Sequence, residues 1–161
     1  MERAIDLAAI ARVAKRSELK SLRLVAIKAE CNKSVMGTLV PSVDLNCKPA
    51  RVEGNALEVI CEYKFTAHSN AAVAVSSTFT YLLDYAISGG ESPSAGDLAE
   101  FANANGALNS WPFVREVLFG LTSRMGFPPY TLPLMHFNPT PKTKEPAQKP
   151  ATPAVETPVA Q

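Results

Sequence analysis

A chain of 161 residues, 47% of them hydrophobic, is long enough for one domain with a sizeable core. Its formal charge of +1 at pH 7 gives no electrostatic reason to expect nucleic acid or an anionic membrane as a partner. Three cysteines, Cys31, Cys47 and Cys61, without a CxxC spacing favour reduced thiols in a cytosol-like compartment.

The N-terminal stretch predicts a helix rather than a leader. Charged residues precede any apolar run, so we expect no secretory signal. No window approaches the ~20 uninterrupted apolar residues that a membrane span needs, so we expect a cytoplasmic protein without membrane insertion. From Ile5 to about Lys20, apolar residues share one helical face. Because this face is narrow and rich in alanine, packing on the chain's own domain is favoured over a partner or membrane contact.

Beyond this helix the hydrophobic period changes to two, which is typical of strands. The four alternating runs are Leu22–Glu30, Leu39–Cys47, Leu57–His68 and Val73–Tyr85. Pro41 predicts that the second strand is an edge strand or carries a bulge. Lys48–Ala56 predicts a loose hairpin loop, and 68–70 a short turn. Strands joined in succession by short turns predict an antiparallel meander, which can bury one face and leave the other wet.

Two helices are predicted after the strands. The first begins at Ser94, which forms a weak capping box with Asp97, and a break is expected before Ser110–Trp111. In the second helix, Pro112 suits the first turn and Gly126 suits the position just past the last turn. Its apolar stripe consists of Val114, Val117, Leu118, Leu121 and Met125.

The chain closes with an extended segment and a tail. Pro128 and Pro129 exclude further helix, so Tyr130–Phe137 must run extended. Residues 138–161 hold six of the 13 prolines and few apolar side chains, which predicts a disordered Pro-rich tail. We therefore expect an N-terminal helix at 1–20, a domain at 21–137 and the tail at 138–161. The predicted fold class is α+β, with a four-stranded antiparallel meander sheet and two C-terminal helices on one face.

No catalytic or metal-binding constellation emerges from the sequence. His68 and His136 are far apart and lack metal-ligand spacing, and the scattered glycines form no phosphate-binding loop. Cys47 and Cys61 fall on predicted core faces, where thiols are usually inert packing. Arg115–Glu116 is interpreted as a charged helix face rather than as a catalytic pair. We expect no enzyme, no metal and no cofactor.

Apolar side chains remain on the face that two helices would leave open. Val40, Ile60 and Leu82 lie there, and Val25 and Ile27 are further candidates. Exposed apolar area of this kind usually marks association or ligand binding. Oligomerisation is the simplest interpretation.

Two motifs in the stretch 111–137 are specific enough to compare with known families. Residues Trp111–Glu116 are WPFVRE, Leu121–Pro128 are LTSRMGFP, and the stretch closes on Leu132-Pro133-Leu134 and His136-Phe137. They resemble the SecB family of export chaperones, which carries a Pro-aromatic-x-Arg-Glu helix, a Ser-Arg-x-x-Phe/Leu-Pro turn and a Leu-rich extended segment closing on an aromatic. The resemblance covers about Leu19 to Phe137, including four preceding strands.

The resemblance implies an ATP-independent holdase of the cytoplasm. Such a protein is a homotetramer, a dimer of dimers, that binds unfolded or nascent polypeptides in long apolar grooves. The client-binding residues that it implies here are Tyr63, Phe65, Phe79, Tyr81, Phe127, Tyr130, Leu132, Leu134 and Phe137. The corresponding oligomer contacts are Trp111, Phe113, Arg115 and Glu116. For Phe65 and Phe79, a place in the core is at least equally expected.

Two features leave alternatives open. Export members present acidic residues on the sheet to the SecA motor, whereas the matching strands here offer Arg23, Lys28, Ser76 and Ser77. Those members also continue into another helix, where this chain enters its Pro-rich tail. A dedicated SecB-like chaperone of a toxin–antitoxin system fits equally well. The remaining alternative is a non-chaperone module that holds one peptide or small ligand on the same fold.

Overall fold

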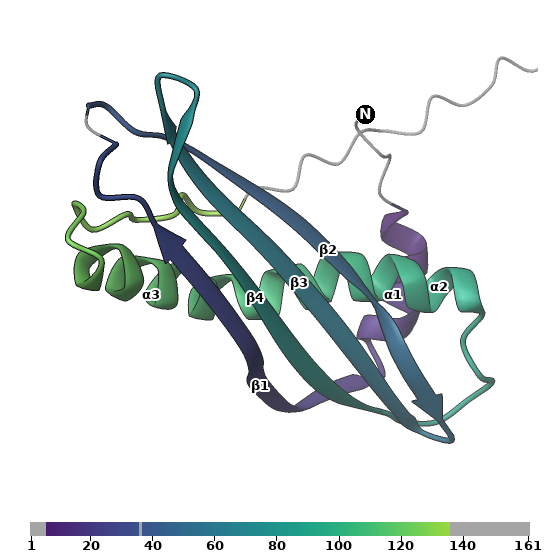
Figure 1. Ribbon diagram of the computed structural model, residues 1–161. Helices are drawn as coiled ribbons and strands as arrows, with labels where there is room; N and C mark the ends of the chain where they lie inside the picture. Colours follow the sequence, from purple (N-terminus) through teal and green to yellow (C-terminus); the bar gives the residue numbers. More distant parts are fainter. Residues whose placement is uncertain (1–5, 36, 136–161) are drawn as a thin grey trace, which may run out of the picture.

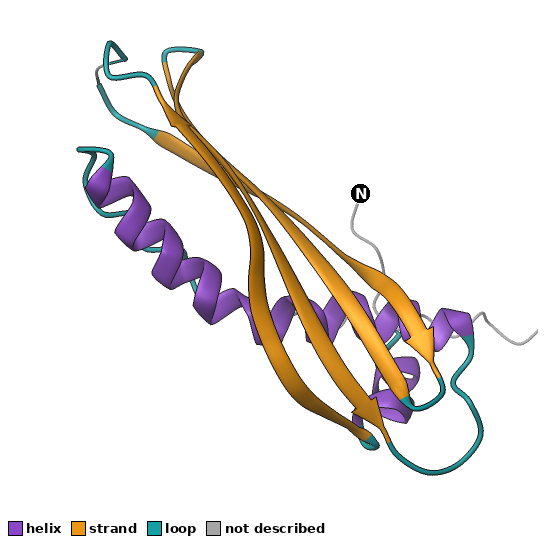
Figure 2. Cartoon of the chain, turned by 60° about the horizontal axis from the view of Figure 1, so that its bottom comes forward, coloured by secondary structure: helices purple, strands orange, loops and turns teal. Residues whose placement is uncertain are grey.

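The computed structural model describes residues 6–35 and 37–135. Its elements are helix α1 (Leu7–Ala14), strands β1 (Ser17–Cys31), β2 (Val40–Glu53), β3 (Ala56–Ser69) and β4 (Ala72–Ile87), helix α2 (Ala95–Phe101), π-helix η1 (Ala102–Gly106) and helix α3 (Ala107–Arg124). The sheet forms one layer and the helices lie on one side of it (Figures 1 and 2). Predictions for His136, Phe137 and the tail at 138–161 lie outside the described residues.

The four strands form one antiparallel sheet in the order β1-β4-β3-β2. The predicted α+β class is confirmed, but only β2, β3 and β4 follow the predicted meander. β1 pairs with β4 instead of β2, so the connection at 32–39 crosses from one edge of the sheet to the other. Hydrophobic period reports which face a residue occupies and not which strand lies next to it, so the sequence did not reveal this order.

The core lies between the sheet and the long C-terminal helix. On β3, every second residue is buried, as the alternation predicted: Leu57, Val59, Cys61, Tyr63, Phe65 and Ala67. On β4, the predicted core residues Val75, Phe79, Tyr81, Leu83 and Tyr85 are buried, whereas Val73 is exposed and its neighbour Ala74 is buried. These two central strands therefore supply most of the apolar surface that the helices cover.

Two predicted boundaries were wrong because strand pairing extends further than the local pattern suggests. α1 ends at Ala14 instead of near Lys20, since residues from Ser17 onward pair with the end of β4. β2 continues to Glu53 through most of the expected loop at 48–56, and a register shift after Pro49 accommodates the proline in the ladder. The chain then reverses at Gly54, whose φ is +54°.

The predicted break before Ser110–Trp111 was also wrong. α2, η1 and α3 follow one another without interruption, so Pro112 lies inside α3 and not in a first turn. Two side-chain hydroxyls donate to backbone carbonyls of the wide π segment, one from β4 and one from α3. The Tyr85 hydroxyl donates to the Asn105 carbonyl at 3.5 Å, and the Ser110 hydroxyl donates to the Gly106 carbonyl at 2.6 Å.

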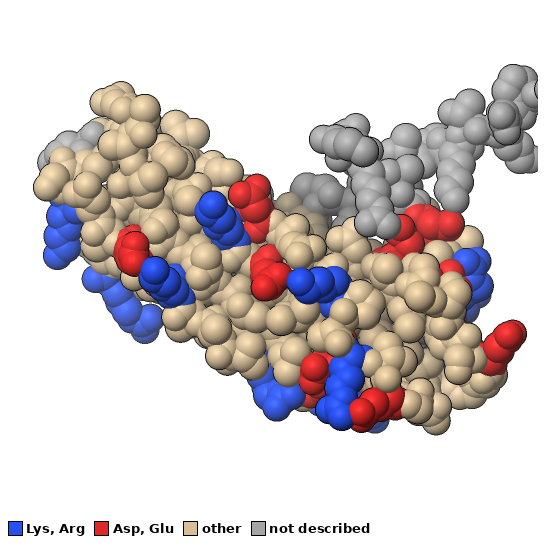
Figure 3. Space-filling model, turned by 45° about the vertical axis from the view of Figure 1, so that its right-hand side comes forward, with Lys and Arg blue, Asp and Glu red and all other residues tan. Residues whose placement is uncertain are grey.

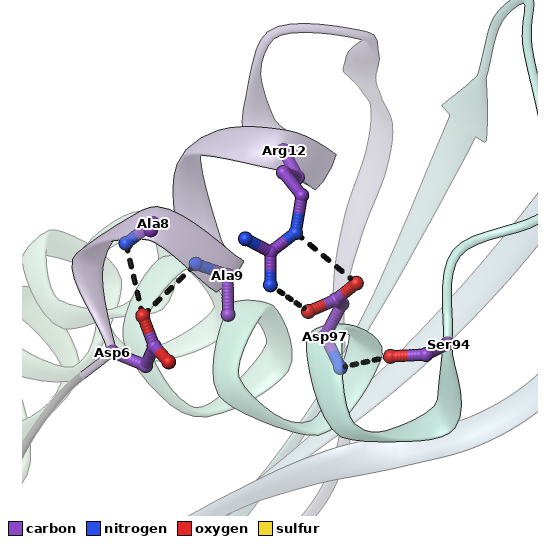
Figure 4. A network of polar contacts seen from close by, with 6 residues as sticks. All are labelled: Asp6, Ala8, Ala9, Arg12, Ser94 and Asp97. Carbon is purple, nitrogen blue, oxygen red and sulfur yellow. Dashed lines mark hydrogen bonds and ion pairs between the residues drawn. The ribbon is translucent and has the colours of Figure 1, made fainter.

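Helix α1 packs beside α2 through a polar network (Figure 4). The Asp6 carboxylate caps α1 by accepting two backbone N–H bonds at 3.1 and 3.2 Å. The Ser94 hydroxyl caps α2 by accepting from the Asp97 N–H at 3.1 Å, as its sequence predicted. Arg12 donates to Asp97 at 2.6 Å, and this hydrogen bond holds the pKa of Asp97 below its usual range.

Candidate functional site: an apolar groove at one end of the sheet

An apolar groove of about 700 Å³ lies between the end of α3 and the connection from β1 to β2. Its floor is formed by Phe65 and Ala67 of β3 and Val75 of β4. One wall is Lys33, Val35, Gly37, Thr38 and Leu39 with Pro41 of β2, and the other is Thr122 and residues 125–130. Lys33 is the one charged residue in this lining, so the groove suits apolar side chains.

The wall after α3 is shaped by a glycine-terminated helix end. Gly126 has a φ of +81° and donates to the Ser123 carbonyl at 3.0 Å. The Phe127 N–H donates to the Thr122 carbonyl at 3.0 Å, which completes a Schellman motif. The motif stops α3, as predicted for Gly126, and turns Phe127 and the two prolines that follow into the groove wall.

Thr122 fixes the direction in which the chain leaves this turn. It is buried, and its hydroxyl donates to the Leu118 carbonyl at 2.9 Å. The same oxygen accepts the backbone N–H of Tyr130, also at 2.9 Å. Tyr130 is thereby held with its ring centroid 5.2 Å from that of Phe65 on the groove floor.

The segment after Tyr130 is fastened to α3 by side chains of the WPFVRE motif. Trp111 donates its Nε1–H to the Pro133 carbonyl at 2.8 Å, and Arg115 donates from Nε to the Leu132 carbonyl at 2.7 Å. Leu132 is buried between these two bonds in the core. An extended segment with no strand partner of its own is therefore tied to the helix by its backbone oxygens.

The opposite wall depends on local turn geometry. The Asn32 N–H donates to the Ala74 carbonyl at 2.8 Å, and its side-chain oxygen accepts from the Ser34 N–H at 3.0 Å. Gly37 has a φ of +111°, and a Cβ there would lie 2.9 Å from the Ser69 hydroxyl oxygen. Glycine is thus required on both conformational and steric grounds.

The groove brings together three of the nine predicted client-binding residues, namely Phe65, Phe127 and Tyr130. Four others are buried in the core, namely Tyr63, Phe79, Tyr81 and Leu132. Leu134 is exposed outside the lining, and Phe137 lies outside the described residues. Their part in client binding stays a prediction.

The predicted oligomer contacts divide into two pairs. Trp111 and Arg115 face the segment of the same chain described above. Phe113 and Glu116 are exposed on α3. Their role in assembly stays a prediction.

Sequence reasoning missed the wall between β1 and β2. Val35 was given no role and Leu39 only a place at the start of the second strand, although both are partly buried against the core. The sequence did offer one signal for this wall: apolar residues lie on either side of Gly37, in a connection too long for a tight hairpin. Their position over Phe65 follows from the β1-β4-β3-β2 order, which brings this connection across the sheet.

Within residues 6–35 and 37–135, no three His, Cys, Asp or Glu side chains gather where they could hold a metal ion. Burial raises the pKa of the Tyr81 and Tyr85 hydroxyls to about 12, so both are neutral at physiological pH. None of the helices in these ranges is long and apolar enough to cross a membrane.

Two curated proteins that match the chain are both SecB-like chaperones. The chain is 26% identical over 146 residues to SecB-like chaperone Rv1957 of Mycobacterium tuberculosis strain H37Rv, covering 78% of this chain and 81% of the relative. SecB-like chaperone MT2006 of strain CDC 1551 matches with the same identity and coverage. No family model matches the sequence.

A solved structure with the same fold is that of Mycobacterium tuberculosis Rv1957 in complex with a ChAD peptide from the Rv1956 HigA1 antitoxin. It matches with a TM-score of 0.69 and 22% identity, and the match covers 80% of this chain and 97% of that one. The resemblance to SecB-like chaperones that the sequence predicted is thereby confirmed.

Proposed function

Because the chain is homologous to SecB-like chaperones, we propose that it is an ATP-independent holdase that binds unfolded polypeptide in the groove at the end of the sheet. The observation that carries this proposal is the apolar groove of about 700 Å³ with Phe65, Phe127 and Tyr130 in its lining. Aromatic and aliphatic side chains of a client would enter the groove, with little demand on their order in sequence. The proposed activity involves no chemical step and takes place in the cytoplasm.

A homo-oligomer forms part of the proposal, as the SecB resemblance implies. β1 is an edge strand without a partner on its outer side, and Ile27 is 49% exposed although it lies on the helix side, opposite Phe79. Phe113 and Phe119 of α3 are 47% and 50% exposed. Other copies of the chain would cover the edge of β1 and the exposed side of α3. Two separate contact surfaces on each copy support a dimer of dimers.

SecA docking receives no support from the outer face of the sheet. Arg23 pairs with Asp84 at 2.8 Å, and Lys28 pairs with Glu30 at 3.1 Å, so acidic groups there have basic neighbours. Charges of both signs are interspersed on the face seen in Figure 3.

The second candidate function is that of a chaperone dedicated to a single client. The solved relative is bound to a peptide from an antitoxin, which favours a chaperone dedicated to a toxin–antitoxin system. Binding of one antitoxin segment at least a hundredfold more tightly than generic unfolded chains would establish this candidate. A toxin–antitoxin gene pair beside this gene would point the same way. Comparable binding of many unfolded chains would instead establish the general holdase.

The proposal is tested by adding the protein, without nucleotide, to a chemically unfolded client as the client is diluted into buffer. We expect light scattering from client aggregation to fall as the ratio of chaperone to client rises. Tyr130→Ala removes a ring from the groove and should weaken client binding about tenfold, since truncating an interface aromatic typically costs ~1–2 kcal/mol.

Val52→Ala is the matched control, because Val52 is an exposed apolar residue at the opposite end of β2. It should protect the client as well as the unaltered chain does. If the unaltered chain leaves aggregation unchanged while it remains folded, the holdase proposal fails. Equal weakening by both substitutions would place binding outside this groove.

A further inference from the structure

Two of the three cysteines face each other directly across neighbouring strands. Cys47 of β2 is the register partner of Cys61 of β3. Both side chains lie on the helix-covered face, 5% and 0% exposed, and both thiols are reduced. Directly opposed residues of an antiparallel pair have Cα atoms about 4.5–5.5 Å apart, which is within the range that a disulfide spans.

Closing a bond between these sulfurs needs only a small movement. Cβ atoms of opposed residues are about 4.5–5.5 Å apart, whereas a disulfide holds them at about 3.5–4.5 Å. β3 is held by strands on both sides, but β2 is an edge strand whose register shifts just after Pro49. β2 can therefore move toward β3 without breaking pairing elsewhere in the sheet.

The π-helix η1 covers Cys47 and Cys61 on the helix side of the sheet. A Cβ at Gly106 would lie 2.9 Å from the Cys61 sulfur and 3.3 Å from the Cys47 Cβ, so helix and thiols are in close contact. The hydrogen bond with Cys61, and then burial, raise the pKa of Cys47, which keeps this thiol neutral. A neutral, covered thiol reacts slowly, so oxidation requires β2 to open transiently.

We propose that Cys47 and Cys61 are a modification site: a peroxide converts them to an intramolecular disulfide that locks β2 to β3. In this reaction both S–H bonds break and one S–S bond forms. The oxidant is hydrogen peroxide: two electrons and two protons pass to it, its O–O bond breaks, and two water molecules leave. Cys31 is exposed on β1, at the other edge of the sheet, and cannot compete for this bond within the chain.

The lock has a consequence for the groove. Pro41, in the groove lining, belongs to the same strand as Cys47. Fixing β2 against β3 restrains this wall and resists peeling of the edge strand. The chain-entropy model of a short disulfide loop gives up to about a hundredfold decrease in the unfolding equilibrium constant.

The test uses the Cys31→Ser protein, which cannot cross-link through the exposed thiol. It is treated with hydrogen peroxide, with and without urea below the unfolding transition, and digested without reductant. We expect mass spectrometry to find the Cys47 and Cys61 peptides joined with loss of two hydrogens, faster when urea is present. The oxidised protein should require more urea to unfold, and reduction should reverse this shift.

A Cys31→Ser/Cys47→Ala protein is the control, and it should show neither the cross-link nor the stabilisation. Isolated sulfinic or sulfonic acids at Cys61 in the parent, without the cross-link, would overturn the proposal. So would complete resistance of both thiols while urea opens β2. Because these readouts concern bond formation, they stand or fall independently of client binding.

Discussion

Gly106 offers a sharp test of how closely the π segment packs on the sheet. Replacing it by alanine adds one methyl group, whose carbon would lie 2.9 Å from the Cys61 sulfur, 3.0 Å from the Val59 Cγ1 and 3.3 Å from the Cys47 Cβ. Each of these distances is shorter than a comfortable contact of about 3.5–4.0 Å. The three neighbours come from β2 and β3, so no single flexible side chain can relieve the crowding.

The magnitude follows from two opposing effects. Overpacking a core position by a methyl group costs about 1–3 kcal/mol. Alanine in place of glycine in a helix gains up to about 1 kcal/mol of propensity. Gly106→Ala should therefore lower the free energy of unfolding by about 1–2 kcal/mol.

The matched control is Gly120→Ala in α3. The nearest atom to a Cβ there is an Arg124 guanidinium nitrogen at 3.2 Å, at the end of a flexible side chain. This substitution should raise the free energy of unfolding by about 0.5–1 kcal/mol. The same chemical change thus has opposite effects on the free energy of unfolding in η1 and in α3, which follow one another without interruption.

Urea unfolding followed by circular dichroism and Trp111 fluorescence measures both effects, at one fixed protein concentration in case subunits dissociate. Adding Cys61→Ala to Gly106→Ala removes the closest atom and should recover part of the loss, so the two substitutions should be non-additive. If Gly106→Ala is as stable as Gly120→Ala, the contact between η1 and the thiols is looser than the distances indicate.

Two further substitutions examine the α1–α2 network and the faces of α3. The Arg12 hydrogen bond lowers the pKa of Asp97 in the folded state. The ionised Asp97 carboxylate therefore stabilises the fold fully above its ordinary, unfolded-state pKa near 4, and this stabilisation is lost as pH falls through the lower folded-state pKa. Thermal unfolding should show Asp97→Asn less stable than the parent at neutral pH, with the difference vanishing in acid; a constant difference would contradict this. Leu118→Ala, at a fully buried position, should cost about 2–5 kcal/mol. Phe119→Ala, half exposed, should change monomer stability by less than about 0.5 kcal/mol, and should shift sedimentation toward smaller species if this face joins subunits.

Most buried positions of the sheet could be predicted from the sequence, because the alternation of apolar and polar residues is a local pattern. Alternation along β3 and β4 identified most buried positions; on β4 it fails at Val73, which is exposed, and at Ala74, which is buried. Strand order was not local information. The pairing of β1 with β4 depends on which edge offers partners, and β4 extends to Ile87, where it pairs with Ser17.

The helix between Ala95 and Arg124 shows tertiary contacts overriding local propensity. Asn103, Asn105 and Gly106 are poor helix formers, which is why a break was expected. The hydroxyls of Tyr85 and Ser110 bond to carbonyls of this segment and support it as a π turn. The contact from Tyr85 joins residues 20 positions apart, so it lies outside the short windows over which helix propensity acts.

The groove residues that follow a sequence motif could be predicted, whereas those brought to the groove by the order of the strands could not. Phe127 and Tyr130 follow a recognisable helix end, and both line the groove. Val35 and Leu39 do so only because the β1–β2 connection crosses the sheet. A groove wall drawn from a crossing connection becomes visible only once the strand order is known.

The WPFVRE motif gains a physical role that its family resemblance did not supply. Residues 130–135 have no regular secondary structure; Tyr130 lines the groove, and the residues after it continue along α3. Their backbone is held by Thr122, Trp111 and Arg115, each through a side-chain bond. Loss of any of these bonds would free part of this segment, which strand pairing does not hold. Within the chain, Trp111 and Arg115 of the motif therefore fix the segment that follows Tyr130 against α3.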